Sequence, residues 1–318
     1  MTQISRWDYT IGHNHDKFQE WYAEVIYSRP VGKNHDNLDN WKRLVAKYGK
    51  DWEYYDRDLF FGYKWNSMGH RNDYEFNSWG NKPWMLALGD SNVEGTGNRR
   101  IDLFHEVIAK EKGLVNYNAG IGGTSNHAAM WNGLTLLNLA ETKPEFVLIR
   151  LTDSKRYSFL HSLAESAYES PAYKYKLKDV NTKGTMSYET DVSTTRDIKN
   201  VRYGGLMFHQ GPWTDRSPWV DLYLDRDEHK VDKSETRIMF LMLQQYCYIN
   251  NIQLVLLTAT GQSARDNWEK FAQIPGTIEV EEIRVEDGEW HTIPKARDDM
   301  HFGASHHFKI AQRVLEAI

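Results

Sequence analysis

The sequence predicts an α/β fold, in which a doubly wound, flavodoxin-like parallel sheet is covered by helices on both faces. Three observations predict this fold. Short apolar runs end in loops, helical stretches of about ten to fifteen residues follow them, and glycine-rich or polar turns separate the two. Strands that alternate with helices of this length are typical of parallel βαβ units.

Four apolar runs are the expected strands, at residues 84–88, 114–118, 146–151 and 252–257. The expected helices follow at about 96–112, 125–140, 238–250 and 304–317. Residues 232–235 have the form of a capping box ahead of the third helix, which predicts where that helix begins.

Two regions fall outside this alternation. Residues 1–80 hold six of the 12 tryptophans, and we expect an irregular extension packed on a domain at 81–318, with one helix near 37–48. Residues 153–231 are too long for a simple loop, so we expect an insertion after the third strand, with a helix near 159–168. The aromatic side chains of both regions either stack on sugar rings or anchor these segments to the core.

Composition excludes several classes of protein. With 318 residues, 40% hydrophobic and 26% charged, the chain is long enough to bury a sizeable core and is not disordered or fibrous. A formal charge of -5 gives no basic field for nucleic acid. The start lacks the order of a secretion signal and no stretch suits a membrane helix. We therefore expect a soluble protein without membrane contact, cytoplasmic or exported by another route.

Chemically useful residues follow the predicted strands. Ser91 comes after the first strand, the glycine turn 120–123 after the second and Thr152 after the third, while Asp298 and His301 precede the last helix. Because ligands of open parallel sheets bind at the carboxyl ends of the strands, these residues are expected to meet there. A serine, a turn rich in backbone N–H groups and a carboxylate–histidine pair are the parts of a nucleophilic acyl-transfer site.

These motifs resemble those of the SGNH or GDSL hydrolases, over about residues 84–151 and 234–318. The matching blocks are Gly89-Asp90-Ser91-Asn92, Asn118-Ala119-Gly120-Ile121-Gly122-Gly123 and Asp298-Asp299-Met300-His301. The resemblance implies that Ser91 is the nucleophile, His301 the base and Asp298 the residue that orients it. Asp299 is the competing partner of His301, and the family spacing favours Asp298. The backbone N–H groups of Ser91 and Gly123 would hold the oxyanion, and no cofactor is implied.

The third block departs from the family pattern, because Thr152-Asp153 stands where the family has asparagine and aspartate. Thr152 is then the expected third oxyanion donor, in place of an amide. A softer resemblance is the Asn66-Ser-Met-Gly-His-Arg71 segment, similar to one that precedes the first strand in some family members. A Gly-x-Ser-x-Gly elbow of the α/β-hydrolases occurs nowhere in the chain.

The resemblance implies a serine esterase that removes small acyl groups, notably O-acetyl groups, from a small-molecule or glycan ester. Two alternatives stay open: a non-catalytic module that binds glycan or builds an assembly, and an O-acyltransferase that uses the same residues. Candidate substrate-binding residues are Asn92, Asp153, Arg150 and Arg156, the two arginines being either contacts for an acidic substrate or ordinary surface charges. We expect no metal site, and interpret the pairs His13/His15 and His306/His307 as solvated surface. Cys247 is expected in the core.

Overall fold

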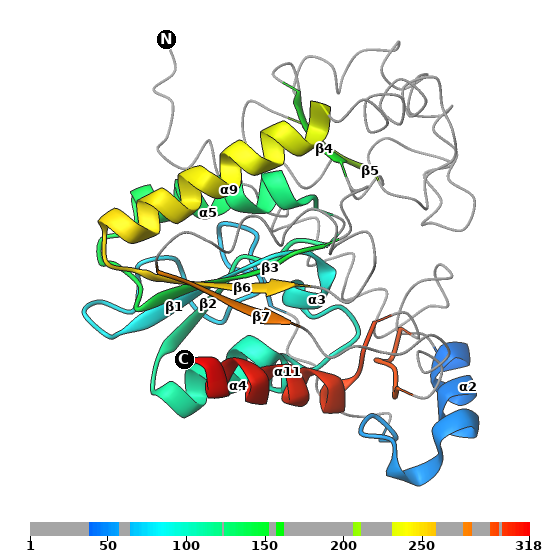
Figure 1. Ribbon diagram of the computed structural model, residues 1–318. Helices are drawn as coiled ribbons and strands as arrows, with labels where there is room; N and C mark the ends of the chain where they lie inside the picture. The colour runs from blue at the N-terminus through cyan, green and yellow to red at the C-terminus, as the bar shows by residue number, and fades with distance from the viewer. Residues whose placement is uncertain are drawn as a thin grey trace.

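The computed structural model describes residues 38–56, 64–122, 124–152, 157–161, 206–210, 231–258, 276–281, 293–298 and 301–318. Its centre is a sheet of five parallel strands in the order β2-β1-β3-β6-β7 (Figure 1). The strands are β1 (Trp84–Leu88), β2 (Val115–Asn118), β3 (Phe146–Arg150), β6 (Gln253–Thr258) and β7 (Thr277–Glu281). The predicted doubly wound parallel sheet is therefore confirmed, and β7 is a fifth strand that the sequence pattern did not predict.

The strand sequences explain the burial of the sheet. Every residue of β1 and β3 is buried, as expected for strands with helices on both faces. Along β1, Trp84, Leu86 and Leu88 point to one face, while Met85 and Ala87 point to the other. The continuous apolar run thus supplies two hydrophobic cores at once, and each fully buried large side chain contributes about 1.5–3 kcal/mol to folding.

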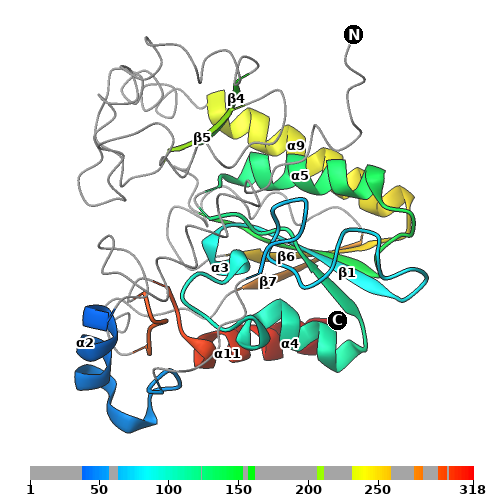
Figure 2. The ribbon, with the colours of Figure 1, turned by 180° about the vertical axis from the view of Figure 1, so that it is seen from behind.

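Two pairs of helices cover these faces, as the opposite views of Figures 1 and 2 show. Helices α5 (Asn126–Leu139) and α9 (Val231–Ile249) pack on one face, and α4 (Phe104–Lys112) and α11 (Ala304–Ala317) on the other. Cys247 of α9 is buried as expected, and burial raises the pKa of its thiol to about 12. None of the described helices is long and apolar enough to cross a membrane.

Two expected helices differ from the structure in where they begin. Instead of one helix from residue 96, the chain forms α3 (Ser91–Glu94), the 3-10 turn η2 (Arg100–Asp102) and then α4. Gly95 and Gly97 adopt left-handed backbone angles, φ +85° and +74°, which stop a helix between them. Helix α9 begins at Val231, so residues 232–235 lie inside it and not before it.

The insertion contains a strand pair where a helix near 159–168 was expected. Strand β4 (Tyr157–His161) pairs antiparallel with β5 (Leu206–Gln210), so the expectation is wrong for its first three residues. Strand formation depends on pairing with a second strand, and no pattern in the sequence indicates pairing between two segments so far apart. The intervening residues 162–205 lie outside the described part of the chain.

The described part of the first 80 residues packs in two places. Helix α2 (Leu38–Tyr48) and the 3-10 turn η1 (Gly49–Asp51) lie beside the amino end of α11 (Figures 1 and 2). There, Trp52 and Tyr54 are buried with Leu44 and Ala296. Residues 64–80 instead join the core under α5 and α9, where Phe76 and Trp79 pack edge to face. These buried aromatic side chains anchor their segments.

Candidate active site

A tight turn at the carboxyl end of β1 presents Ser91 at the amino end of α3 (Figure 1). A Cβ atom on Gly89 would lie 2.5 Å from Val93 Cγ2 and 3.0 Å from the Arg150 carbonyl oxygen, so only glycine fits. The side chain of Asp90 caps α3 by accepting the N–H of Asn92 at 3.0 Å. Close packing and this cap fix the direction in which the next residue, Ser91, leaves the sheet.

Ser91, His301 and Asp298 form a continuous hydrogen-bonded row at this turn. His301 Nε2 lies 2.7 Å from Ser91 Oγ, and His301 Nδ1 faces Asp298 Oδ2. The other carboxylate oxygen of Asp298 accepts the backbone N–H of His301 at 3.1 Å. Asp298 is buried, whereas His301 is partly exposed. The row suits an imidazole that carries its proton on Nδ1 and accepts the Ser91 proton at Nε2.

The carboxylate of Asp90 connects the turn that carries Ser91 to the end of β3. It forms an ion pair of 3.2 Å with Arg150 and accepts the hydroxyl of Thr152 at 2.8 Å. Arg150 has only 6% of its side chain exposed. This corrects the expectation of a surface cation, because the guanidinium is used to balance a buried carboxylate. The Thr152 proton likewise points to Asp90, which corrects the direction toward an oxyanion that we expected.

Two asparagine side chains lie around this carboxylate, and one of them binds the backbone of Thr152. Asn126, at the start of α5, accepts the N–H of Thr152 at 2.8 Å and donates to its carbonyl at 3.0 Å. Asn92 is half-buried beside Ser91, and its amide lies 3.3 Å from Asp90 Oδ1. Asn126 was not predicted from the sequence, because nothing in its neighbourhood along the chain marks it as a partner of the β3 loop.

The glycine turn after β2 packs directly against the turn that carries Ser91. A Cβ atom on Gly120 would lie 2.4 Å from the backbone nitrogen of Glu94. The N–H of Ile121 donates to the Gly89 carbonyl at 3.0 Å, and the N–H of Gly122 donates to the Glu94 carboxylate. These glycines therefore allow the close approach of two backbones. Gly123, the expected oxyanion donor, lies outside the described residues.

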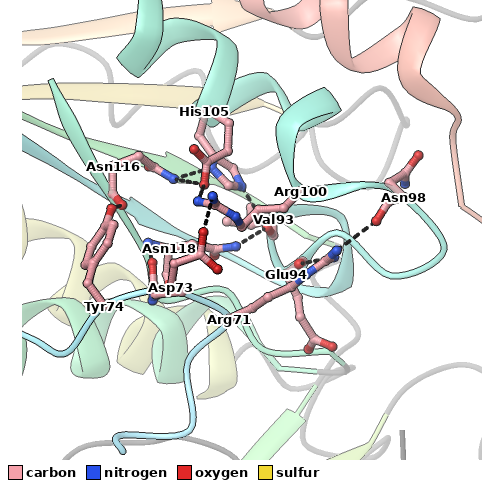
Figure 3. A network of polar contacts seen from close by, with 12 residues as sticks. Arg71, Asp73, Tyr74, Val93, Glu94, Asn98, Arg100, His105, Asn116 and Asn118 are labelled. Atoms are coloured by element: carbon pink, nitrogen blue, oxygen red, sulfur yellow. Dashed lines mark hydrogen bonds and ion pairs between the residues drawn. The ribbon is translucent and has the colours of Figure 1, made fainter. Parts of the chain in front are cut away.

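A buried polar network underlies the turn, and Figure 3 shows it from close by. Arg71 donates to the carbonyl oxygens of Glu94, Gly95 and Asn98, at 3.1, 2.5 and 2.8 Å. The segment 66–71, noted in the sequence for its family-like pattern, thus supplies an arginine that binds the loop after Ser91. That pattern was the one signal in the sequence for this contact.

On its other side, the same network supports α3 through its carbonyl oxygens. The carbonyl of Val93 accepts from His105 Nε2 at 2.8 Å and from Asn118 Nδ2 at 3.0 Å (Figure 3). The Nδ1 atom of His105 accepts from Asn116 at 2.8 Å. Burial lowers the pKa of His105 to about 3, so this histidine is neutral and acts only as a structural partner.

The remaining candidate residues divide into two groups. Asp153, Arg156, His13, His15 and Asp299 lie outside the described residues. His306 and His307 are buried and not solvated, which corrects the surface expectation. His307 stacks on Phe104 with 5.7 Å between ring centroids, and burial holds its pKa well below the usual range. No group of three or more metal-ligating side chains occurs among the described residues.

No protein-family model matches this sequence, and no curated protein matches it either. Several solved structures, however, match this chain in fold. A protein described as a lipolytic protein of the G-D-S-L family from Desulfitobacterium hafniense aligns at 9% identity and a TM-score of 0.42, over 74% of this chain and 98% of its own. Esterase EstA from Pseudoalteromonas sp. aligns at 12% and 0.38, over 74% and 96%.

A third structure is a family two carbohydrate esterase from Clostridium thermocellum, solved in complex with cellohexaose. It aligns at 9% identity and a TM-score of 0.40, over 74% of this chain and 62% of its own, so this chain spans less than two thirds of that protein. At such identities the likeness concerns the fold alone. The chain is similar in fold, at low sequence identity, to hydrolases and esterases of the SGNH or GDSL type.

Proposed function

We propose that this protein is a serine ester hydrolase. The observation that carries the proposal is the row of Ser91, His301 and Asp298, in which His301 Nε2 lies 2.7 Å from the serine hydroxyl. A serine hydroxyl becomes an effective nucleophile when an adjacent base takes its proton, and the base works when a third group holds its tautomer. Both conditions are met by side chains that the fold brings together at the carboxyl end of β1.

The reaction follows from this geometry. Ser91 Oγ attacks the ester carbonyl carbon while its proton passes to His301 Nε2, and Asp298 stabilises the imidazolium. The tetrahedral intermediate collapses, the carbon–oxygen bond to the alcohol breaks, and His301 protonates the leaving alcohol. A water molecule then gives its proton to His301 and attacks the acyl-enzyme. This step releases the carboxylic acid and restores Ser91.

The oxyanion of this reaction needs hydrogen-bond donors near Ser91. Among the described residues, none accepts the backbone N–H of Ser91, which supports it as one donor. We assign the second to the N–H of Gly123, the role that the resemblance of its sequence block to SGNH hydrolases implies. Because the Thr152 proton is directed to Asp90, we do not count Thr152 as a donor, and a missing donor costs about 10²–10³ in turnover. We therefore expect modest rates.

The finer proposal is that the acyl group is small, as in an O-acetyl ester of a carbohydrate. It rests on the resemblance of the motifs to SGNH hydrolases. The buried tryptophans at 52, 65 and 79 do not supply a sugar-stacking surface, because their rings are used for packing. An O-acyltransferase would use the same residues and differs only in the acceptor of the acyl group.

The test is hydrolysis of p-nitrophenyl esters with acyl chains of two to eight carbons, by wild type and Ser91→Ala. The matched control is Ser78→Ala, since Ser78 is exposed and precedes the amino end of β1, whereas Ser91 follows its carboxyl end. We expect turnover that falls with chain length, disappears in Ser91→Ala and persists in Ser78→Ala. Faster acetate release from acetylated xylan than from p-nitrophenyl acetate would support the carbohydrate substrate, and acetyl transfer to added oligosaccharide would support the transferase.

Background rates in wild type on every ester, equal to those of Ser91→Ala, would contradict esterase activity. The non-catalytic alternative would then lead, and glycan binding by the unmodified protein would be measured next.

A further inference from the structure

Ser91 and His301 stand 210 positions apart in the sequence, and a four-residue segment lies between the turn of one and the loop of the other. We call this segment, residues 95–98, the strap. The strap follows α3 directly, and its first two residues are bonded to Ser91. The N–H groups of Gly95 and Thr96 donate to the Ser91 carbonyl at 2.8 and 3.0 Å. The strap therefore moves together with the nucleophile turn.

The strap is attached to the loop of His301 on both sides of that histidine. Before it, the N–H of Arg297 donates to the Gly97 carbonyl at 3.1 Å. After it, the side chain of Asn98 donates to the Phe302 carbonyl at 2.9 Å. Between these points the backbone of Gly97 packs against the carboxylate of Asp298, because a Cβ atom on Gly97 would lie 2.7 Å from Asp298 Oδ1. The base and its carboxylate are thus bracketed by one short segment.

The amide of Asn98 is fully used and fully buried. Its nitrogen donates to the Thr96 carbonyl at 3.2 Å as well as to Phe302, and its oxygen accepts the hydroxyl of Tyr54 at 2.7 Å. No part of the residue is exposed. The carbonyl oxygens of Thr96 and Phe302 select the orientation of the amide, since the opposite orientation would set its oxygen against two acceptors. The backbone of Asn98 has a contact of its own, because Arg71 donates to its carbonyl oxygen at 2.8 Å (Figure 3).

We propose that Asn98 is a positioning residue, which sets the distance between Ser91 Oγ and His301 Nε2 by tying the strap to the histidine loop. The inference rests on the proposed function for its kinetic consequence, although the geometric role stands by itself. Misplacing a reacting group by about 1 Å costs about 10²-fold in rate. Asn98 touches neither substrate nor the reacting atoms, so its effect passes through His301.

Asn98→Asp is the sharpest test, because it keeps the shape and exchanges the donor for an acceptor that faces two carbonyl oxygens. We expect kcat on p-nitrophenyl acetate to fall about 10- to 100-fold, with KM within about twofold. The matched control is Asn138→Asp, an exposed asparagine of α5 whose amide donates to the Leu134 carbonyl of the same helix. Tyr54→Phe removes one hydroxyl and should lower kcat in the same direction by a smaller factor.

A second readout separates this proposal from the esterase proposal. In protein labelled with ¹⁵N histidine, the ring nitrogen signals of His301, assigned with His301→Gln, report its hydrogen bonds without any turnover. We expect them to shift in Asn98→Asp and Tyr54→Phe, and to match wild type in Asn138→Asp. Unchanged signals in folded Asn98→Asp, or in Tyr54→Phe if Asn98→Asp does not fold, would overturn the positioning role. An inactive wild type with shifted signals would overturn only the esterase.

Discussion

Ser91 and His301 meet at one point, but the chain brings them there by different means. Ser91 directly follows the central strand β1, and its turn is fixed by glycine contacts and by the ion pair of Asp90 with Arg150. His301 belongs to a loop, residues 293–298 and 301–303, that is held by an isolated bridge and by side chains from remote segments. Ser91 is thus placed by the topology of the sheet, and His301 by individual hydrogen bonds.

The comparison predicts its largest effect at the base. Asp298→Asn keeps the shape but offers an N–H where His301 Nδ1 has its proton, so the wrong tautomer faces Ser91. We expect kcat/KM to fall about 10⁴-fold, as in other enzymes with this arrangement. The measurement is hydrolysis of p-nitrophenyl acetate, with a denaturation curve to show that the variant is folded. A loss of less than about tenfold would mean that Asp298 is not the orienting carboxylate.

The difference between how Ser91 and His301 are held also explains which parts of the fold and of the site could be predicted from the sequence. Four of the five parallel strands are apolar runs in the sequence, so these strands and the place of Ser91 after β1 could be predicted, whereas β7 could not. The pair Asp298/His301 was predicted from the family-like motif that contains it. The partners of the base could not be predicted. The contact between Asn98 and Phe302 joins residues 204 positions apart, through a side chain and a carbonyl. Such a contact leaves no period or spacing in the sequence, because any residue offers a carbonyl.

Substitutions in the ion pair beside Ser91 should mainly lower the stability of the protein. Arg150→Met removes the partner of Asp90 and leaves a buried carboxylate short of a charge, which costs about 3–5 kcal/mol. Chemical denaturation should show this as a lower midpoint with an unchanged slope. In the double variant Asp90→Asn/Arg150→Met, where neither charge remains, we expect part of the stability to return. Equal or greater loss in the double variant would contradict a charge-pairing role.

Acid should also lower the stability of the protein, through the buried His105 that supports α3. The pKa of His105 is lowered from its ordinary value of 6.5 to about 3, because burial disfavours the charged ring. Between these two pH values His105 is protonated in the unfolded chain but neutral in the folded protein. Its contribution to the free energy of unfolding is therefore fully present above pH 6.5 and is lost as the pH falls toward 3. The free energy of unfolding should fall by about 1.4 kcal/mol per pH unit for this group.

The variant His105→Gln tests that assignment, since glutamine keeps an amide donor but does not titrate. Free energies of unfolding measured by urea at several pH values between 4 and 6.5 should fall less steeply in the variant than in wild type. His307, whose pKa is also lowered by burial, keeps part of the dependence in both proteins. Parallel curves for the two proteins would show that His105 does not carry the effect.

The smallest effect is expected from a substitution beside the loop of His301. Trp52 Nε1 donates to the Lys295 carbonyl at 2.8 Å, and Trp52→Phe removes this bond while keeping an aromatic ring in the core. Losing one such bond costs about 1–2 kcal/mol of stability. Because Lys295 pairs with Phe302, next to His301, the loss should also lower kcat about threefold. The half-exposed Trp131→Phe should change neither quantity measurably. If Trp52→Phe lowers stability without any change in kcat, the aromatic segment stabilises the histidine loop without setting the position of the base.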